Sequence, residues 1–165
     1  MRFLLFLLLF LNIAFSKGVP SNPAHRFTDE EKILLLLSEF EQRFNEKDMG
    51  ILHLFSRDYK DEQGIEYEEL GEIFGDFFSK YKGQAPIIYF ENPKIEGEEK
   101  ERKVETRVWI IKGTKGVHQD IQIQVKKIEN NWCIIDAGEF MRNIIGKGKK
   151  LQIREKTKKE SHEQK

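Results

Sequence analysis

The sequence predicts a single α+β domain in which helices come first and an antiparallel sheet follows. In the first half of the chain, apolar residues recur three and four positions apart, the spacing of an amphipathic helix. From about residue 86 to 140, apolar and polar residues alternate between turn signals, which is typical of half-buried strands. The only cysteine is Cys133, so no disulfide can form within the chain and packing must hold the fold together.

Three helices are expected before the strands. The first begins at Thr28, because residues 28–31 (TDEE) form a capping box, and it ends near residues 45–47. Asp48 can cap a short second helix over residues 49–56. A third helix is expected from about Tyr67 to Tyr81. The apolar face of the first helix is Ile33, Leu34, Leu37, Phe40 and Phe44, and that of the third includes Leu70, Phe74, Phe77 and Phe78.

The predicted sheet is an antiparallel meander. Its first strand, near residues 86–95, contains Pro93, which indicates an edge strand or a bulge. Strands over 103–112 and 117–127 flank a hairpin turn at 113–116, and the last strand begins at Trp132. With Lys112 and Val117 flanking the turn, one row of the hairpin faces the core. In that row Ile110, Val108, Thr106 and Val104 face Gln119, Ile121, Ile123 and Val125.

The facing of Asp136 depends on the turn at residues 129–131. If this turn has two central residues, Trp132, Ile134 and Asp136 join the core row. A three-residue loop would instead place Asp136 on the polar face that carries Arg107. Both registers are compatible with the sequence.

The two ends of the chain differ from the domain between them. Residues 1–16 combine Arg2 with an apolar run and small residues at 14 and 16, which predicts a signal peptide cleaved after Ser16 and a secreted or periplasmic protein. An uncleaved membrane anchor is the alternative reading of the same residues. A short linker over 17–26 leads to the domain at 27–145, and 146–165 form a basic tail that is expected to be disordered.

Charge is distributed unevenly, although the whole chain has a formal net charge of +0. The tail from Gly146 onward has eight Lys/Arg and three Asp/Glu, whereas residues 26–145 have 18 and 25. An acidic domain argues against nucleic-acid binding. The tail is expected to solubilise the protein or to contact anionic surfaces weakly.

The order of these motifs resembles the nuclear transport factor 2-like (SnoaL-like) superfamily. The similar features are the first amphipathic helix, a short helix running into LFSRDYKDEQG, the helix YEELGEIFGDFFSKY, and a last strand that starts with Trp in NNWCIID. The resemblance covers about residues 27–140. It implies a cone-shaped fold, with N-terminal helices packed against a curved, mainly antiparallel sheet that encloses a pocket. Many members dimerise through the outer face of the sheet.

The resemblance also indicates where a site would lie. In ketosteroid isomerase, a member of this superfamily, a general-base Asp works with a Tyr and a protonated Asp in an apolar pocket. Similarity to that enzyme would make Asp136, with Tyr59 or Asp61, the candidate catalytic set. The candidate pocket is Asp136, Trp132, His53, Tyr59, Phe74 and Phe78. Because the superfamily contains enzymes and non-enzymes, the resemblance transfers no activity.

Each candidate has a structural alternative. Asp136 can be a strand-end residue that binds nearby backbone, His53 can be a residue at the core boundary, and Tyr59 with Asp61 can belong to a polar turn. Trp109 lies in an otherwise polar row, which favours an interface made with Arg107 and Gln122.

The sequence lacks the motifs of several function classes. The four His and one Cys have no metal-ligand spacing, and neither a phosphate-binding loop nor a cofactor motif is present. The reading that we favour is a non-catalytic protein that binds a small apolar ligand or a protein partner. The alternatives are an isomerase- or dehydratase-like enzyme and a dimeric interaction protein without a pocket.

Overall fold

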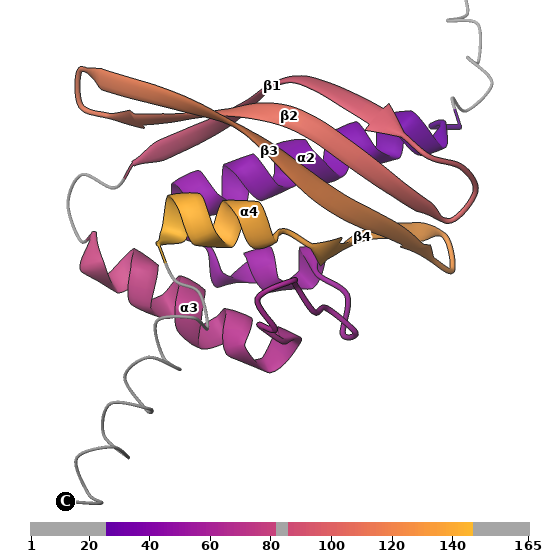
Figure 1. Cartoon of the computed structure of the whole chain (residues 1–165), viewed down its shortest axis with the longest axis horizontal. Helices are drawn as coiled ribbons and strands as arrows, with labels where there is room; N and C mark the ends of the chain where they lie inside the picture. Colours follow the sequence, from indigo (N-terminus) through magenta and orange to yellow (C-terminus); the bar gives the residue numbers. More distant parts are fainter. Residues whose placement is uncertain (1–25, 82–85, 147–165) are drawn as a thin grey trace, which may run out of the picture.

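The computed structural model of the chain describes residues 26–81 and 86–146 (Figure 1). Apart from Arg26 and Gly146, the predicted signal peptide, linker and tail lie outside the described residues. The helices α2 (Asp29–Glu46), η1 (Met49–Leu54) and α3 (Tyr67–Lys80) come first, then four strands, then α4 (Gly138–Phe140) and a π-helical turn η2 (Met141–Ile145). Among the described helices, none is long and apolar enough to cross a membrane.

Helix α2 begins as its sequence predicts. The Glu31 amide donates to Thr28 Oγ1 at 3.2 Å and the Thr28 amide donates to Glu31 Oε2 at 2.7 Å, so both halves of the capping box form. The buried face consists of Ile33, Leu36, Leu37, Phe40 and Phe44. Leu34 was predicted on this face, but it is 42 % exposed and Leu36 takes its place, because the helix is rotated slightly relative to the predicted stripe.

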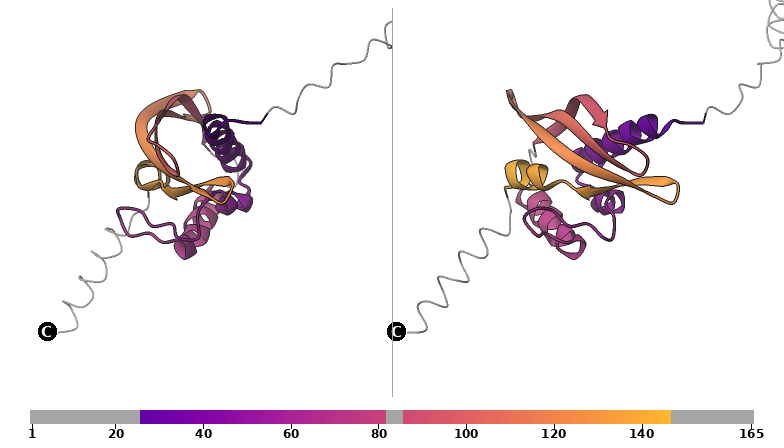
Figure 2. Two further views of the ribbon diagram at one scale, coloured as in Figure 1. Left: turned by 90° about the vertical axis from the view of Figure 1, so that its right-hand side faces the viewer. Right: turned by 45° about the vertical axis from the view of Figure 1, so that its right-hand side comes forward.

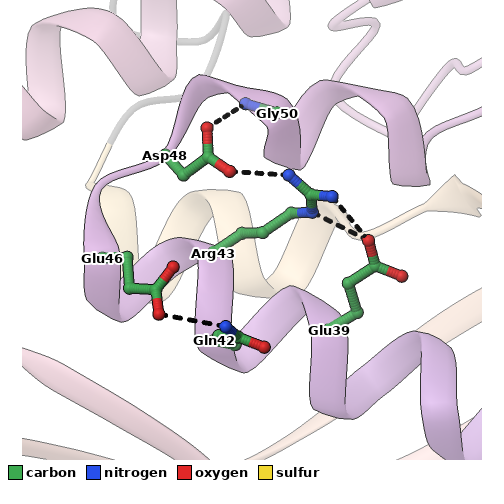
Figure 3. Close-up of polar contacts among 6 residues, drawn as sticks. All are labelled: Glu39, Gln42, Arg43, Glu46, Asp48 and Gly50. Carbon is green, nitrogen blue, oxygen red and sulfur yellow. Dashed lines mark hydrogen bonds and ion pairs between the residues drawn. The ribbon is translucent and has the colours of Figure 1, made fainter.

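An ion-pair cluster holds the turn between α2 and η1 (Figure 3). Arg43 donates from Nε and Nη2 to Glu39 Oε1 at 2.9 and 2.7 Å, and from Nη1 to Asp48 Oδ2 at 2.6 Å. Asp48 in turn accepts from the Gly50 amide at 2.8 Å and so caps η1, as predicted. A Cβ on Gly50 would lie 2.1 Å from Arg43 Nη1, so a side chain there would displace the guanidinium from this cluster.

Four antiparallel strands form one sheet in the order β1 (Ile87–Glu96), β2 (Glu101–Lys112), β3 (Lys115–Ile128) and β4 (Asn131–Asp136). The predicted hairpin register is wrong by two residues, since Lys112 pairs with Lys115 and Ile110 with Val117. The turn is shorter than expected because Gly113, at φ 61°, supplies the positive φ of a two-residue turn. A shift of two keeps every side chain on its predicted face.

The strand faces are therefore as predicted. Val104, Val108, Ile123 and Val125 are fully buried, whereas the opposite row carries charged residues and Trp109. Pro93 lies in an edge strand and also in a bulge, where the β1–β2 register shifts between Glu91 and Lys94. Figure 2 shows the sheet curling over α2, so that its inner row and the helices enclose one core.

Side chains of α2 cover the free edge of β1. The Asn45 side chain donates to the Ile88 carbonyl at 2.9 Å and accepts from the Ile88 amide at 2.8 Å, as a neighbouring strand would. One turn earlier, Glu41 accepts from the Phe90 amide at 3.0 Å. These two side chains satisfy main-chain groups that an edge strand otherwise leaves open.

We expect Asn45→Ala to lower the free energy of unfolding by about 2 kcal/mol, because it leaves a part-buried amide and carbonyl of Ile88 without partners. Urea denaturation of the two proteins measures the loss. Gln42→Ala on the exposed side of the same helix is the control, with an expected effect within about 0.5 kcal/mol. Equal effects of the two variants would contradict the role assigned to Asn45.

Aromatic rings fill the interior. Phe40 lies at the centre, with ring centroids at 5.0 Å from Phe140, 5.7 Å from Phe90 and 5.9 Å from Phe55. Phe140 and Met141 belong to α4 and η2, and both are fully buried. The prediction of strand up to about residue 140 is wrong at this point, because β4 ends at Asp136. The candidate pocket residues Phe74 and Phe78 pack into the same cluster.

Candidate functional site

Asp136 faces outward because of a bulge in β4 that neither of the two predicted registers included. The last turn has two central residues, as one alternative required, because Ile128 pairs with Asn131. The register then shifts, so that Ile134 pairs with Val125 but Asp136 pairs with Gln124 on the polar face. Ile135 is the extra residue of this bulge, and its carbonyl accepts from the Lys60 amide while that of Ile134 accepts from Ser56.

Tyr59, Asp61 and Asp136 do come together, around the turn that follows β4. Tyr59 Oη accepts from the Ala137 amide at 3.3 Å, and Asp136 Oδ1 accepts from the Gly138 amide at 2.7 Å. Gly138 lies between the two aspartates, since a Cβ there would lie 3.2 Å from Asp136 Oδ1 and 3.3 Å from Asp61 Cβ. The set predicted from the resemblance is thus a structural cluster, and it joins residues 59–65 to the end of β4.

Two residues of this cluster are inaccessible to a substrate. Tyr59 is 1 % and Asp61 4 % exposed. Asp61 Oδ1 accepts from the amides of Gln63 and Ile65, each at 2.9 Å, which is the backbone-binding turn that the sequence analysis kept as the alternative. Burial, followed by the charge of Asp61, raises the pKa of Tyr59 far above its ordinary value. Tyr59 is therefore a neutral hydroxyl that supports the Ala137 amide.

Asp136 is the accessible member. Burial raises the pKa of Asp136, the bond from the Gly138 amide opposes this, and the charges of Asp61, Glu62 and Glu139 add to the rise. Its surroundings are a hollow of about 80 Å³, the volume of two or three waters. Ligand sites usually measure several hundred Å³, so this hollow by itself is too small for an organic substrate.

The raised pKa predicts a pH dependence. A carboxyl whose pKa is higher in the folded than in the unfolded chain stabilises the fold in acid, and this contribution is lost as the pH rises from the unfolded to the folded value. Asp136→Asn keeps an oxygen for the Gly138 amide and removes the titration. We expect the variant to gain stability relative to the wild type between pH 4 and pH 7, in guanidinium titrations. A constant difference between the two proteins would contradict the shift.

The other candidate pocket residues are dispersed. Trp132 is buried at the start of α2, where its Nε1 donates to Asp29 Oδ1 at 3.3 Å and the Arg102 guanidinium lies 5.5 Å from its ring centroid. His53 is on the exposed side of η1. The structure therefore does not bring Trp132, His53 and Asp136 to one pocket, because Asp136 faces out of the sheet and His53 lies on the exposed side of η1.

The predicted interface residues Trp109, Arg107 and Gln122 do share the outer face. Arg107 Nε donates to Asp120 Oδ1 at 2.9 Å, and Trp109 Nε1 donates to Glu91 Oε2 at 3.0 Å. An open polar hollow of about 440 Å³ crosses this face beside them. Its lining includes Glu91, Lys94, Glu105, Arg107, Asp120 and Glu139.

Apolar residues gather around Trp109 at the hairpin end of this face. The Tyr89 ring stacks on Trp109 at 6.1 Å between centroids, and the His118 ring meets Trp109 edge-on at 4.8 Å. We call Ile87, Tyr89, Trp109, Ile111 and His118 the outer aromatic patch. Tyr89 and Ile87 are 37 % and 48 % exposed. Sequence reasoning missed both, although their alternation with the buried Ile88 could have indicated them.

No group of three or more His, Cys, Asp or Glu within residues 26–81 and 86–146 is placed to hold a metal ion. Cys133 is partly buried, and burial raises the pKa of its thiol, which opposes formation of the reactive thiolate.

Solved structures share this arrangement of helices and sheet. A protein of unknown function with a cystatin-like fold from Nostoc punctiforme has a TM-score of 0.57 at 22% identity, over 66% of this chain and 86% of its own. An NTF-2 like protein of unknown function from Shewanella oneidensis has a TM-score of 0.54 at 15% identity, over 66% and 96%. A candidate scytalone dehydratase from Novosphingobium aromaticivorans has a TM-score of 0.51 at 20% identity, over 65% and 79%.

Sequence comparisons add nothing to these structures, since no family model and no curated protein matches the chain. At identities under 25% a structural likeness shows the fold and not the activity. The resemblance predicted from the order of the motifs is thereby confirmed: the chain has the nuclear transport factor 2-like, α+β fold.

Proposed function

We propose that this protein is a non-catalytic interaction module that binds a protein partner, in the first instance a second copy of itself, through the outer face of its sheet. The outer aromatic patch carries the proposal. Aromatic side chains concentrate at the centres of protein interfaces, and here they are grouped on a face whose other residues are charged. Charged rows beside the patch, such as Arg107 with Asp120, are suited to a polar rim.

The contents of the interior favour a partner over a small apolar ligand or a substrate. The rings around Phe40 leave the predicted pocket residues Phe74 and Phe78 packed against neighbouring side chains. Asp136, the one accessible member of the candidate catalytic set, borders a hollow of about 80 Å³ only. Both observations support a binding module that works with its surface.

Export is part of the proposal, and it is supported by the sequence of residues 1–16 alone. Expression of the full chain in a bacterial host and mass measurement of the purified protein tests it. Cleavage after Ser16 gives a mature chain that begins at Lys17, whereas a full-length mass would contradict the proposal.

The outer aromatic patch is tested by sedimentation velocity. We expect the wild type to form a dimer and Trp109→Lys to be monomeric, because a desolvated ammonium would replace the ring at the centre of the patch. Tyr89→Lys, at a more exposed position, should act the same way with less effect on folding. Leu35→Lys, on the 51 % exposed side chain of α2, is the control and should remain dimeric. A dimer that survives both patch variants would contradict the proposal.

A further inference from the structure

One stretch of the sheet edge is open. Strand β3 pairs with β2 along Lys115–Lys126, but β4 covers its other side only from Gln124 to Ile128. In Figure 1, β4 runs beside only one end of β3, and the hairpin end of β3 extends beyond it. Within the described residues, no strand pairs with Lys115–Ile123 on this side.

The direction of the main-chain groups follows from the pairs that are made. Two-residue turns pair Lys112 with Lys115 and Ile128 with Asn131, and the residues that flank such a turn exchange main-chain hydrogen bonds. The odd-numbered residues of β3 near the first turn therefore direct their N–H and C=O groups toward β2, and the even-numbered ones direct theirs away from it. The Gln122 amide, next in this row, donates to Glu139 Oε2 at 2.7 Å. Gly116, His118 and Asp120 continue the row and are all exposed. The open segment is therefore Lys115–Ile121, which we call the open β3 edge.

Within the described residues, parts of the other two edges, on β1 and β4, are covered. Asn45 and Glu41 bind the main chain of β1, and Pro93 with its bulge interrupts the rest of that strand. The segment 55–60 covers β4 through the Ser56 and Lys60 amides. Proteins usually blunt free edges with such devices, because an uncovered edge pairs with other chains. Along Lys115–Ile121 none of the described side chains binds the free main-chain groups and there is no Pro or bulge, although Lys115 and Asp120 are charged; Val117 is 63 % exposed.

We infer that the open β3 edge binds the same edge of a second copy, in antiparallel orientation, with His118 opposite His118. This inference rests on the proposed function only in taking the partner to be a second copy. It assigns the contact to the edge of the same sheet, beside the outer aromatic patch, and His118 belongs to both. The Gln122 amide is already bound to Glu139, so pairing must end before it. The midpoint of Lys115–Ile121 is His118, and a symmetric antiparallel pair is centred on the midpoint of the segment that it uses.

Charge and side-chain size agree with this register. Antiparallel pairing sets the Lys115 end of one strand beside the Asp120 end of the other, whereas a parallel pair would place like charges together. Asp120 lies opposite Gly116, so its ion pair with Arg107 at 2.9 Å is not disturbed. A pairing two residues longer would require main-chain groups beyond Ile121. A pairing centred on Asp120 would place the Asp120 carboxylates of the two copies directly opposite each other, where they would repel. The two outer aromatic patches then lie on the same face of the joined sheet, on either side of the junction.

A symmetric cysteine tests the register. In a Cys133→Ser background, His118→Cys places two thiols on directly opposed residues about 5.5 Å apart at Cα, within the range of a disulfide. Asp120→Cys is the matched control on the same face of the same strand, since its counterpart would lie four residues further along. Mild oxidation followed by non-reducing electrophoresis should convert most of the His118→Cys protein to a covalent dimer, with at least a tenfold excess over Asp120→Cys.

The outcomes separate the inference from the proposed function. No crosslink at His118→Cys, or equal crosslinking of both variants, overturns the edge pairing. If the wild type is nevertheless a dimer that Trp109→Lys dissociates, the proposed function stands without it. If His118→Cys crosslinks selectively and Trp109→Lys remains dimeric, the edge pairs but the outer aromatic patch is not the binding surface. Thiol labelling of both unfolded variants confirms that each cysteine was reactive.

Discussion

Phe40→Ala is expected to lower the free energy of unfolding by about 3 to 5 kcal/mol, the range for truncating a fully buried aromatic residue. The Phe40 ring is fully buried and contacts rings from α3, β1 and the end of the chain, at 6.5 Å from Phe74, 5.7 Å from Phe90 and 5.0 Å from Phe140. Its removal leaves a cavity bounded by several elements, which cannot collapse together to fill it.

Urea denaturation at constant pH measures this loss. Leu35→Ala on the exposed side of the same helix is the control, with an expected change within about 0.5 kcal/mol. A loss below about 1 kcal/mol for Phe40→Ala would mean that the interior is loosely packed. That result would favour a protein that binds a small apolar ligand in its interior over an interaction module.

Asp61→Ala is expected to cost about 3 kcal/mol, since it removes the acceptor of two main-chain amides and one of them is buried. Asp61 Oδ1 binds the Gln63 and Ile65 amides, each at 2.9 Å, while Oδ2 is buried without a hydrogen-bond partner among the described residues. The side chain therefore stabilises the 61–65 turn and, through Gly138, the end of β4.

Asp61→Asn is the informative control. Its Oδ1 can keep both amide bonds, and the neutral side chain avoids a buried charge, so we expect a much smaller loss than for Asp61→Ala. Thermal unfolding of the three proteins at one pH compares them. Equal losses for Asn and Ala would show that the carboxylate charge matters, which would reopen a role for Asp61 beyond the turn.

Much of the fold could be predicted because its signals are local. The capping box at Thr28, the cap at Asp48 and the alternation along β2 and β3 each depend on residues close in sequence. Even the two-residue error in the hairpin left the faces correct, because the period of a strand is two. Pro93 likewise marked both the edge and the bulge of β1.

The candidate site was less predictable, since it depends on contacts distant in sequence. The bulge at Ile135 is held by amides of residues 56–60, and nothing in NWCIID itself indicates it. The resemblance correctly grouped Tyr59, Asp61 and Asp136, but it could not show that phenylalanines fill the space beside them. Likewise, α4 and η2 lack the length of a periodic helix signal, so their burial of Phe140 was not expected.

In the proposed assembly, the side chains of Asn45 and Glu41 that bind the edge of β1 limit how many copies can join. When two copies pair through β3, the outermost strand at each end of the joined sheet is β1. Side chains of α2 bind the main chain of each β1. Neither end can then accept a third molecule, so the contact is isologous and closes at two. The same open edge on a sheet without these side chains would propagate into a filament. In the proposed dimer, two side chains of one helix thus separate a finite complex from a filament.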